Sequence, residues 1–252
     1  MTDALSSSSQ AVAAPRLSVV IAVLNEAENV AAVAADAVAA LAALDPFEIV
    51  FVDDGSTDET AAVIAYLATS DPRIRLVRHD RKCGKSQAVR TGVMAARGEW
   101  VATLDGDGQH APSDLPAMLA KAQAATDPAP LVAGIRVRRD DPVSRLIATR
   151  IANGIRSSLL GDHCPDTGCG VKLFRRGDFL LLPCFEGTHR FLPALFQRYG
   201  HPLINHPVKH RARMLGVSKY SNLGRAAVGV FDMATVAWIV RRTTAPKVID
   251  ER

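Results

Sequence analysis

The sequence predicts an α/β fold in which a mostly parallel sheet is flanked by helices. Short apolar runs rich in Val and Ile alternate with longer Ala-rich stretches of good helix formers. The apolar runs are nearly continuous, as expected for parallel strands that are buried on both faces. Alternation of strand and helix favours a parallel sheet with helices on each side. With 252 residues, the chain can form one such domain, or a domain with a small appendage.

The first half of the chain predicts five strands joined by helices. We expect the strands at Leu17–Val23, Phe47–Val52, Ile74–Arg78, Trp100–Leu104 and Leu131–Ile135. We expect the helices between them at Glu26–Leu44, Asp58–Ser70, Ser86–Ala96 and Pro112–Ala125. The last of these helices has Ser113 or Pro112 at its start, and a proline ring suits a first helical position.

After residue 136 the pattern changes, and strands and helices no longer alternate regularly. The expected order is a helix at Ser144–Leu160, a Gly/Cys/Asp loop, a strand at Val171–Phe174, a helix at Arg190–Tyr199, a strand at Leu203–Val208, and a helix at Leu223–Arg242. The chain has no internal repeat and no linker between two domains. We therefore predict a disordered tail over residues 1–15, one domain over 16–222, a terminal helix over 223–242, and a tail over 243–252.

Composition excludes several classes of protein. The net charge of +4 and the pI of 9.0 are mild, and no basic stretch is interleaved with aromatic residues, so we expect no nucleic-acid partner. The four cysteines show no C-x-x-C spacing, and a chain of this size needs no disulfides. We expect reduced thiols, with Cys169 the best candidate for a thiol near a site.

The N-terminal residues lack the basic and apolar regions of a signal peptide.

The loop after the second strand is a candidate ligand-binding segment. Parallel sheets bind ligands at the carboxyl ends of their strands, which directs attention to the loops after the first, second and fourth strands. From Asp53 to Thr57 the sequence is D-D-G-S-T. Adjacent carboxylates can accept hydrogen bonds from a base edge or from ribose hydroxyls, and Gly55 allows the backbone to turn. The same pattern also fits an ordinary strand-to-helix turn with a capping residue.

The loop after the fourth strand is a candidate metal site. From Asp105 to His110 it reads D-G-D-G-Q-H, with two carboxylates on a glycine-flanked turn. Such oxygen ligands suit Mg²⁺ or Mn²⁺ bridging phosphates. An EF-hand is excluded because no Glu stands at the twelfth loop position. For His110 we expect a hydrogen-bonded role in the turn, with metal ligation as the alternative.

Taken together, these motifs resemble the family 2 glycosyltransferases of the GT-A (Rossmann-like) fold. The resemblance is carried by V-V-I-A-V-L-N-E-A-E-N from Val19, V-D-D-G-S-T-D-E-T from Val52, and the D-G-D-G-Q-H turn. Later segments are similar to one branch, the dolichyl-phosphate mannose synthases and the bacterial polyprenyl-phosphate glycosyltransferases. These segments are R-T-G from Arg90, D-T-G-C-G from Asp166 followed by L-F-R-R from Leu173, and S-K-Y from Ser218. The resemblance extends from about residue 16 to residue 242.

The resemblance implies a role for each matching residue. The nucleotide would be bound by Leu24, Asn25, Glu26, Asp53, Asp54, Asp105 and Gly106. The metal would be surrounded by Asp105, Asp107 and Gln109. Arg136 and Arg150 would hold the acceptor and donor phosphates, and Lys219 would close over the diphosphate. The residues expected to carry catalysis are therefore Asp107, Lys219, Arg136 and Arg150.

The implied reaction is an inverting transfer of a hexose from a nucleotide-sugar donor, GDP-mannose or a UDP-sugar, to a polyprenyl phosphate of the dolichyl or undecaprenyl type. A metal ion, Mg²⁺ or Mn²⁺, and Lys219 would neutralise the charge that develops on the leaving diphosphate. A phosphate acceptor is already an anion at neutral pH, so the reaction requires no strong general base. The sequence leaves the sugar and the nucleotide open.

Three other functions compete with this interpretation. Sugar nucleotidyltransferases resemble one another in a Gly-rich, Arg/Lys-containing phosphate loop after the first strand. This chain has L-N-E-A-E from Leu24 at that position, without glycine. A sensor of nucleotide sugars would have no use for the leaving-group residues Asp107 and Lys219. A family 2 enzyme that acts on a saccharide or another non-lipid acceptor stays open, although the D-T-G-C-G and S-K-Y segments favour a lipid phosphate.

The C-terminal end is basic and includes an amphipathic helix. From His201 onward there are nine Lys or Arg and three acidic residues. The apolar stretch within Leu223–Arg242 is too short to span a bilayer and contains Asp232, while Trp238 and terminal arginines suit a membrane interface. We therefore expect a cytoplasmic protein that binds peripherally at the cytoplasmic face of a membrane. The alternatives are a core helix and a helix that docks on a separate transmembrane subunit.

Overall fold

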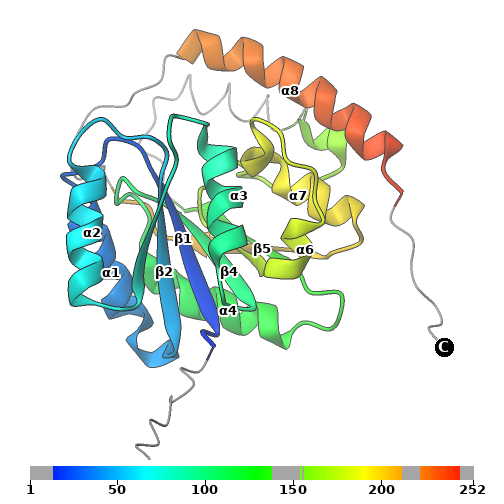
Figure 1. Ribbon diagram of the computed structural model, residues 1–252. Helices are drawn as coiled ribbons and strands as arrows, with labels where there is room; N and C mark the ends of the chain where they lie inside the picture. The colour runs from blue at the N-terminus through cyan, green and yellow to red at the C-terminus, as the bar shows by residue number, and fades with distance from the viewer. Residues whose placement is uncertain (1–13, 138–153, 155, 212–221, 245–252) are drawn as a thin grey trace, which may run out of the picture.

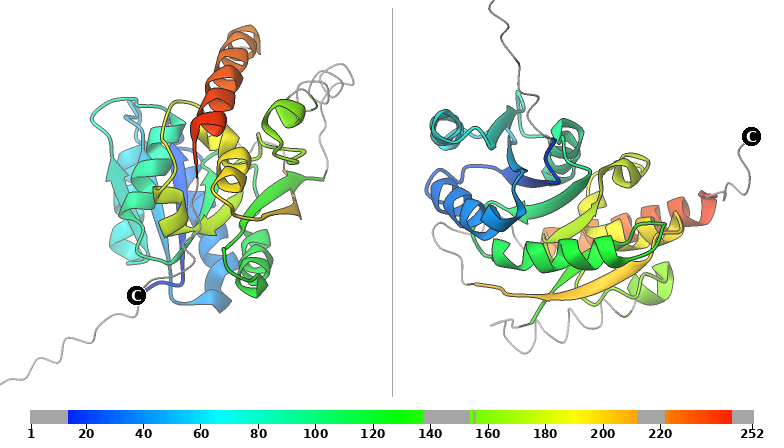
Figure 2. Two further views of the ribbon diagram at one scale, coloured as in Figure 1. Left: turned by 90° about the vertical axis from the view of Figure 1, so that its right-hand side faces the viewer. Right: turned by 90° about the horizontal axis from the view of Figure 1, so that it is seen from below.

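Apolar strands that pair mostly in parallel form the centre of the molecule, and helices cover both of their faces (Figure 1). The computed structural model describes residues 14–137, 154, 156–211 and 222–244, and of residues 222–230 it describes the backbone alone. Seen from below, the sheet lies between its two helical layers (Figure 2). The predicted fold class is confirmed.

The seven-stranded sheet has the order β3-β2-β1-β4-β6-β5-β7. Its strands are β1 (Leu17–Val23), β2 (Phe47–Asp53), β3 (Ile74–Arg78), β4 (Trp100–Asp105), β5 (Leu131–Arg136), β6 (Lys172–Arg175) and β7 (Leu203–Val208). The first four strands pair in parallel, as do β5 and β7, whereas β6 runs antiparallel to both β4 and β5. The antiparallel β6 brings the segment that precedes it back to the carboxyl end of β4.

The helices agree with the sequence prediction except at a few ends. They are α1 (Val30–Leu41), α2 (Thr60–Ser70), α3 (Lys85–Ala95), α4 (Leu115–Ala124), α6 (Arg176–Leu180), α7 (Thr188–Arg198) and α8 (Asn222–Arg242), with 3₁₀ turns η1 (Ala42–Leu44) and η2 (Pro112–Asp114). The short helix α6 was not predicted. Residues 154 and 156–160 are helical, but most of the predicted helix from Ser144 lies outside the described residues.

The first helix begins four residues later than the sequence predicted, because its expected first turn is used in loop contacts. Asn25 has a positive φ of 51°. The backbone N–H groups of Asn25 and Glu26 donate to the side chains of Ser56 and Thr60 at 2.8 Å each. The positive φ and these cross-loop bonds hold Asn25 and Glu26 in a loop conformation, so the helix begins after them.

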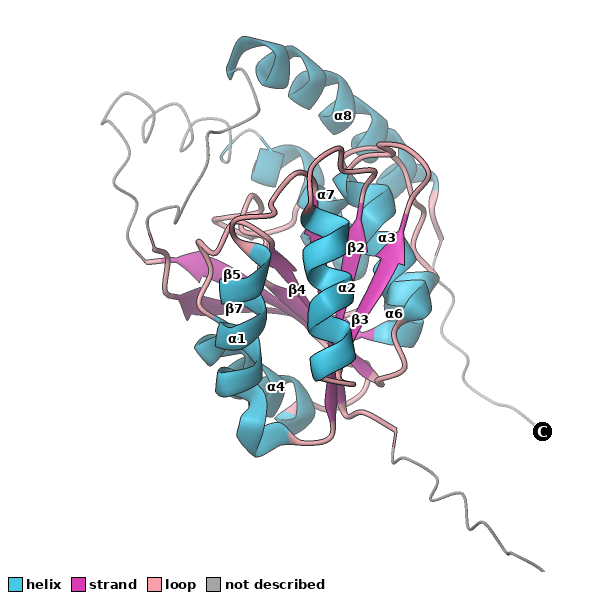
Figure 3. Cartoon of the chain, turned by 60° about the vertical axis from the view of Figure 1, so that its left-hand side comes forward, coloured by secondary structure: helices cyan, strands magenta, loops and turns pink. Residues whose placement is uncertain are grey.

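Two hydrophobic layers hold the sheet between its helices. One layer packs α1, α2 and α4 against side chains such as Val19 and Ile21, and Figure 3 shows these three helices on the near face. The other layer packs α3, α6 and α7 against the opposite face, where Val20 lies. Neighbouring residues of β1 thus enter different layers, as the two-residue period of a strand requires.

The C-terminal helix α8 packs by one side only. Val236 and Ala237 are buried against Phe191 and Ala194 of α7, whereas Phe231 and Trp238 are exposed. The helix lies at the end of the molecule where β1 and β2 terminate (Figures 1 and 3). Within the described part of the chain, no helix has the length and apolar character needed to span a membrane.

The packing of Phe174 gives a direct test of the second layer. This side chain is fully buried, with ring centroids 4.9 Å from Phe179 and 5.6 Å from Phe196. We expect Phe174→Ala to lower the free energy of unfolding by about 3–5 kcal/mol, through lost burial and the cavity left behind. Phe231→Ala is the matched control, since that ring is 74% exposed; it should change stability by no more than about 0.5 kcal/mol. Urea unfolding measures both, and equal losses would contradict this packing.

Candidate functional site

The acidic loops after β2 and β4 flank the end of β1, as the sequence analysis expected. In the sheet register, Val23 pairs with Asp53 on one side, and Ala22 pairs with Asp105 on the other. The backbone N–H of Asp54 donates to the carbonyl of Val23 at 2.9 Å. Parallel pairing therefore brings together carboxylates that are more than fifty residues apart in the sequence.

The predicted nucleotide-binding residues after β1 are fixed by the loop after β2. Besides the bonds that start at Asn25 and Glu26, the N–H of Thr57 donates to Asn25 Oδ1 at 2.8 Å. Leu24, Asn25 and Glu26 are half-buried in this arrangement. The two loops thus form one hydrogen-bonded rim along the carboxyl edge of β1 and β2.

Asp53 and Asp54 are both buried, but they have different partners. Asp53 Oδ1 accepts the N–H of Ser56 at 2.9 Å, and Arg78 lies 3.5 Å from its other oxygen. Asp54 accepts the backbone N–H groups of Cys83 and Gly84 at 2.8 Å each. Asp54 therefore anchors the loop that precedes α3. A contact of either side chain with a nucleotide stays a prediction.

Asp105 lies at the centre of the site, and two basic side chains lie beside its carboxylate. The ammonium of Lys85 forms an ion pair with Asp105 Oδ1, and His110 Nε2 lies 3.4 Å from Oδ2. Burial raises the pKa of Asp105, but Lys85 and His110 outweigh it and hold this pKa well below its ordinary value. The carboxylate is therefore ionised at neutral pH. Lys85, which follows Gly84 at the start of α3, was not singled out by sequence reasoning.

The rest of the acidic turn faces the segment that follows β7. His110 and His210 form an isolated backbone bridge with ring centroids 5.4 Å apart, and Arg211 N–H donates to the carbonyl of Gln109 at 2.8 Å. Asp107 is half-buried, and its Oδ1 accepts the N–H of Gln109 at 3.2 Å. Sequence reasoning missed His210, because nothing in the sequence indicates that this edge segment returns to the turn after β4.

The donor set around this turn fits a hard divalent cation. Burial and the neighbouring His110 lower the pKa of His210, while Asp107 opposes them, so the imidazole is neutral and available as a ligand. The buried Nδ1 atom of His210 has no hydrogen-bond partner among the described residues. The ammonium of Lys85 already occupies a cation position beside Asp105. A divalent ion at this turn would take oxygen ligands from Asp105 and Asp107 and a nitrogen ligand from His210, a residue that the sequence did not suggest; this assignment stays a prediction.

The D-T-G-C-G loop covers the same end of β4. Asp166 makes a two-pronged ion pair with Arg136, with Nε–Oδ2 at 2.7 Å and Nη2–Oδ1 at 2.8 Å. Burial lowers the pKa of Arg136, but Asp166 raises it by more, so the guanidinium stays charged. Sequence reasoning placed Arg136 at a phosphate, and the structure gives it a carboxylate partner within the chain. A phosphate contact stays a prediction.

Gly170 brings this loop into direct contact with the central acid. A Cβ atom on Gly170 would lie 2.5 Å from both carboxylate oxygens of Asp105, so a side chain there has no room. The hydroxyl of Thr103 donates to the Gly170 carbonyl at 2.7 Å, and buried Lys172 donates to the Cys169 carbonyl at 2.5 Å. Glycine at this position therefore permits the close approach that the loop requires.

Comparison with known proteins identifies the family. Residues 18–180 match the family model described as Glycosyl transferase family 2. The chain belongs to glycosyl transferase family 2. It is 34% identical over 210 residues to the undecaprenyl-phosphate 4-deoxy-4-formamido-L-arabinose transferase of Enterobacter sp., covering 82% of this chain and 63% of that protein. It is 30% identical over 239 residues to the dodecaprenyl-phosphate galacturonate synthase of Rhizobium johnstonii, covering 91% and 69%.

Solved structures support the family 2 fold. The glucosyl-3-phosphoglycerate synthase of Mycobacterium tuberculosis, in complex with phosphoglyceric acid, aligns with a TM-score of 0.65 at 19% identity, over 90% of this chain and 80% of that one. The same synthase with Mn²⁺ and UDP-glucose aligns with a TM-score of 0.64 at 22% identity, over 88% and 79%. At these identities the likeness establishes the shared fold alone.

One further histidine of this family 2 chain links the starts of α3 and α7 beside Lys85. His189, at the start of α7, makes a 2.8 Å hydrogen bond between its Nδ1 and the hydroxyl of Ser86. Burial and then Lys85 lower the pKa of His189 well below its ordinary value, which keeps the imidazole neutral. Ser86 follows Lys85 directly, so this bond ties the start of α3 to the start of α7. Sequence reasoning did not single out either residue.

Two predicted catalytic residues, Arg150 and Lys219, lie outside the described residues. Cys169 lies buried in the D-T-G-C-G loop near the site, and burial raises the pKa of its thiol. A raised pKa makes it a poor nucleophile. All four cysteines are free, as the sequence predicted.

The ion pair between Lys85 and Asp105 predicts a pH-dependent stability. The depressed pKa of Asp105 stabilises the fold above the ordinary Asp value of about 3.9, and this contribution is lost as the pH falls through the lower folded-state value. In Lys85→Met, the Asp105 carboxylate loses its main positive neighbour, so burial raises the pKa of Asp105 with less opposition. We expect a loss of about 1–3 kcal/mol in unfolding free energy at pH 7, shrinking below about pH 4.

Chemical denaturation at several pH values measures this difference. Lys121→Met on the exposed side of α4 is the matched control and should cost little at any pH. A loss in Lys85→Met that is the same at neutral and acid pH would show that the methionine disturbs packing instead of the charge balance.

Proposed function

We propose that this chain is an inverting glycosyltransferase that moves a hexose from a nucleoside-diphosphate sugar to a polyprenyl phosphate. The observation that carries the proposal is the acidic turn from Asp105 to Asp107, which lies beside Asp53 across β1 and beneath the D-T-G-C-G loop. The relatives named above are a transferase and a synthase whose names specify undecaprenyl phosphate and dodecaprenyl phosphate. The chain spans 63% of the first relative's length, so activity and substrates are transferred here as proposals.

The rim along β1 and β2 is the proposed nucleotide site. Leu24, Asn25 and Glu26 present a fixed backbone and half-buried side chains, and Asp53 adds a fully buried carboxylate beside them. Rigid acceptors of this kind can bind base N–H and ribose hydroxyl groups without first paying to become ordered. Asp54 contributes by holding the neighbouring loop in place. Gly106 extends the same edge, where we expect the diphosphate.

Mg²⁺ or Mn²⁺ is the proposed cofactor, held by Asp105 and Asp107 with Gln109 or His210 nearby. When bound, such an ion would neutralise charge on the diphosphate leaving group. Lys85 supplies a second positive charge at the same carboxylate. We propose that it turns from Asp105 toward a donor phosphate oxygen when the site is loaded. Lys219 and Arg150 are proposed to add further positive charge from the basic segments of the chain.

The acceptor side of the site is proposed to lie under Arg136 and the D-T-G-C-G loop. A phosphate monoester is already a nucleophilic anion at neutral pH, so positioning and charge balance suffice. Arg136 keeps its charge and can exchange part of its pairing with Asp166 for an acceptor phosphate. Transfer to a saccharide is the second candidate function, and it would require a general base to deprotonate the acceptor hydroxyl. The neutral imidazole of His189, beside Lys85, is the candidate for that base.

We propose that α8 attaches the enzyme peripherally to the cytoplasmic face of a membrane. Phe231 and Trp238 are 74% and 65% exposed and lie seven residues apart, on one side of the helix. Arg241 and Arg242 at its end are exposed and suit anionic head groups. Asp232 lies instead beside the start of α7, where a Cβ on Gly187 would meet its carboxylate at 2.8 Å. The exposed aromatic side is thus free of this acid.

Removal of the metal ligand tests the reaction. We expect Asp107→Asn to lower kcat by about 100-fold or more, because a group that stabilises developing charge is typically worth about 10²–10³. EDTA should abolish turnover of the parent, and Mn²⁺ should restore it. Asp127→Asn, at an exposed carboxylate on the opposite end of the sheet, is the control. Transfer assays use a panel of nucleotide sugars with an undecaprenyl phosphate acceptor. Full activity of Asp107→Asn, or of the chelated enzyme, would contradict the metal mechanism.

Exposed aromatics on α8 provide a separate test of membrane attachment. The double variant Phe231→Ala/Trp238→Ala should lose most of its co-sedimentation with anionic liposomes, since interfacial aromatic rings are removed. Tyr66→Ala is the matched control, because that ring is 72% exposed on α2. Binding of the parent should need anionic lipid and weaken with salt. If the parent ignores liposomes altogether, direct attachment through α8 is wrong, and the helix is either part of the core or a docking surface for a separate transmembrane subunit.

A further inference from the structure

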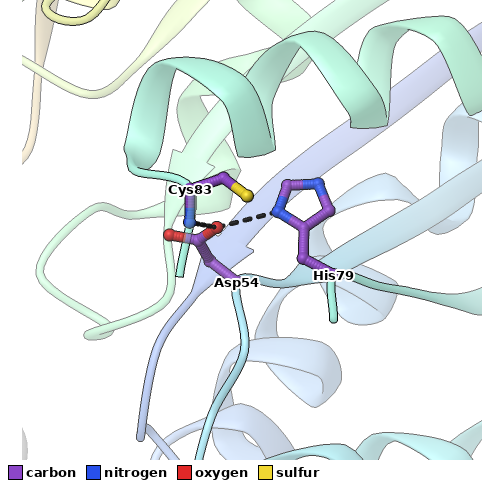
Figure 4. Close-up of side chains that lie close together, drawn as sticks. All are labelled: Asp54, His79 and Cys83. Atoms are coloured by element: carbon purple, nitrogen blue, oxygen red, sulfur yellow. Dashed lines mark hydrogen bonds and ion pairs between the residues drawn. The ribbon is translucent and has the colours of Figure 1, made fainter. Parts of the chain in front are cut away.

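We propose that Asp54, His79 and Cys83 form a Zn²⁺ site at the floor of the nucleotide rim, separate from the hard-metal turn at Asp105. The three residues come from the ends of β2 and β3 and from the loop before α3 (Figure 4). Each offers one ligand atom, and these atoms all lie within 4.8 Å of one another.

The spacing needs little adjustment to hold a tetrahedral ion. His79 Nδ1 lies 2.8 Å from Asp54 Oδ1. Zinc bonds of 2.0–2.3 Å imply ligand-to-ligand separations of about 3.3–3.8 Å. A small opening of the Asp54–His79 contact and a rotation of Cys83 would therefore give three ligands. Cys83 is exposed, so the fourth position faces solvent, as in open zinc sites.

The surroundings already orient buried Asp54 and half-buried His79. His79 Nε2 lies 2.9 Å from the hydroxyl of Thr91, and Asp54 Oδ2 accepts the Gly84 N–H at 2.8 Å. In proteins, an imidazole that binds a metal through one nitrogen usually donates a hydrogen bond from the other. The Thr91 hydroxyl can donate or accept, so it can serve His79 in either neutral tautomer.

The proton balance of binding is simple. In the neutral tautomer that carries Nδ1–H, His79 donates to the Asp54 carboxylate and accepts from Thr91 through Nε2. On binding, the ring proton moves to Nε2 and Thr91 becomes the acceptor. The Cys83 thiol loses one proton to solvent and bonds to the ion as a thiolate. One oxygen, one nitrogen and one sulfur ligand select a borderline-soft ion such as Zn²⁺ over Mg²⁺.

The site has a consequence for donor binding, which rests on the proposed glycosyltransferase function. The loop from His79 to Gly84 passes directly over the turn after β2, where a Cβ on Gly55 would lie 2.5 Å from the Arg81 backbone. An ion that draws Asp54 toward His79 and Cys83 changes the same turn that presents Asp53. Zn²⁺ should therefore inhibit transfer by raising the KM for the nucleotide sugar.

Titration of the purified protein with Co²⁺, followed by displacement with Zn²⁺, tests the site without any assay of activity. We expect a thiolate-to-cobalt charge-transfer band that is lost in Cys83→Ser and kept in Cys184→Ser, the half-buried control thiol. Thr91→Val should weaken Zn²⁺ affinity about 10- to 100-fold, the usual effect of losing a hydrogen bond behind a ligand. Retention of the band in Cys83→Ser, or no band in the parent, would overturn the proposal.

Activity measurements then separate this site from the proposed function. Cys83→Ser should retain the turnover of the parent with Mn²⁺ and lose its sensitivity to Zn²⁺. Equal inhibition of both proteins would overturn the link to donor binding. If neither protein transfers sugar, the cobalt band still decides whether the site exists, because it depends on the three ligands alone.

Discussion

The neutralisation of buried carboxylates at the carboxyl edge of the sheet is the constraint on which the rest of the site depends. Parallel pairing places Asp53 and Asp105 on either side of the end of β1, where burial penalises unpaired charge. Each acid is therefore matched. Asp53 has Arg78, Asp105 has Lys85 and His110, and Asp166 in the covering loop has Arg136. The partners come from loops distant in sequence, so the charges themselves hold those loops at the site.

The same matching gives the site its chemical character. A carboxylate paired with an ammonium stays ionised and ordered, yet exchanges that partner for another cation at low cost. Lys85 and Arg136 are charged groups held near Asp105 by acids in the same chain. Phosphate-bearing substrates would compete for these cations while a divalent ion competes for the acids. In the proposed reaction, such exchange would link donor, metal and acceptor through one set of charges.

The two halves of the sheet supply different residues to the same edge of the family 2 fold. The parallel half, from β3 to β4, presents the acidic rim and the turn at Asp105. The half with β6, β5 and β7 returns the D-T-G-C-G loop and His210 to the same edge. The helix α8 lies at that edge as well (Figure 1), and its side chains Phe231 and Trp238 are exposed. A lipid phosphate held at a membrane surface would thus meet the site without leaving its bilayer.

By itself, the sequence determined the fold class, the family resemblance and the acidic loops, because strand and helix periodicity and the D-D-G-S and D-G-D-G motifs are local. Only the tertiary structure decided which side chains meet. Lys85, His189 and His210 reach the site through a glycine loop, a helix start and an edge strand, and no local pattern marks such returns. The late start of α1 has the same cause. The N–H groups of Asn25 and Glu26, which precede the helix, bond across to Ser56 and Thr60, and these long-range hydrogen bonds hold both residues in the loop.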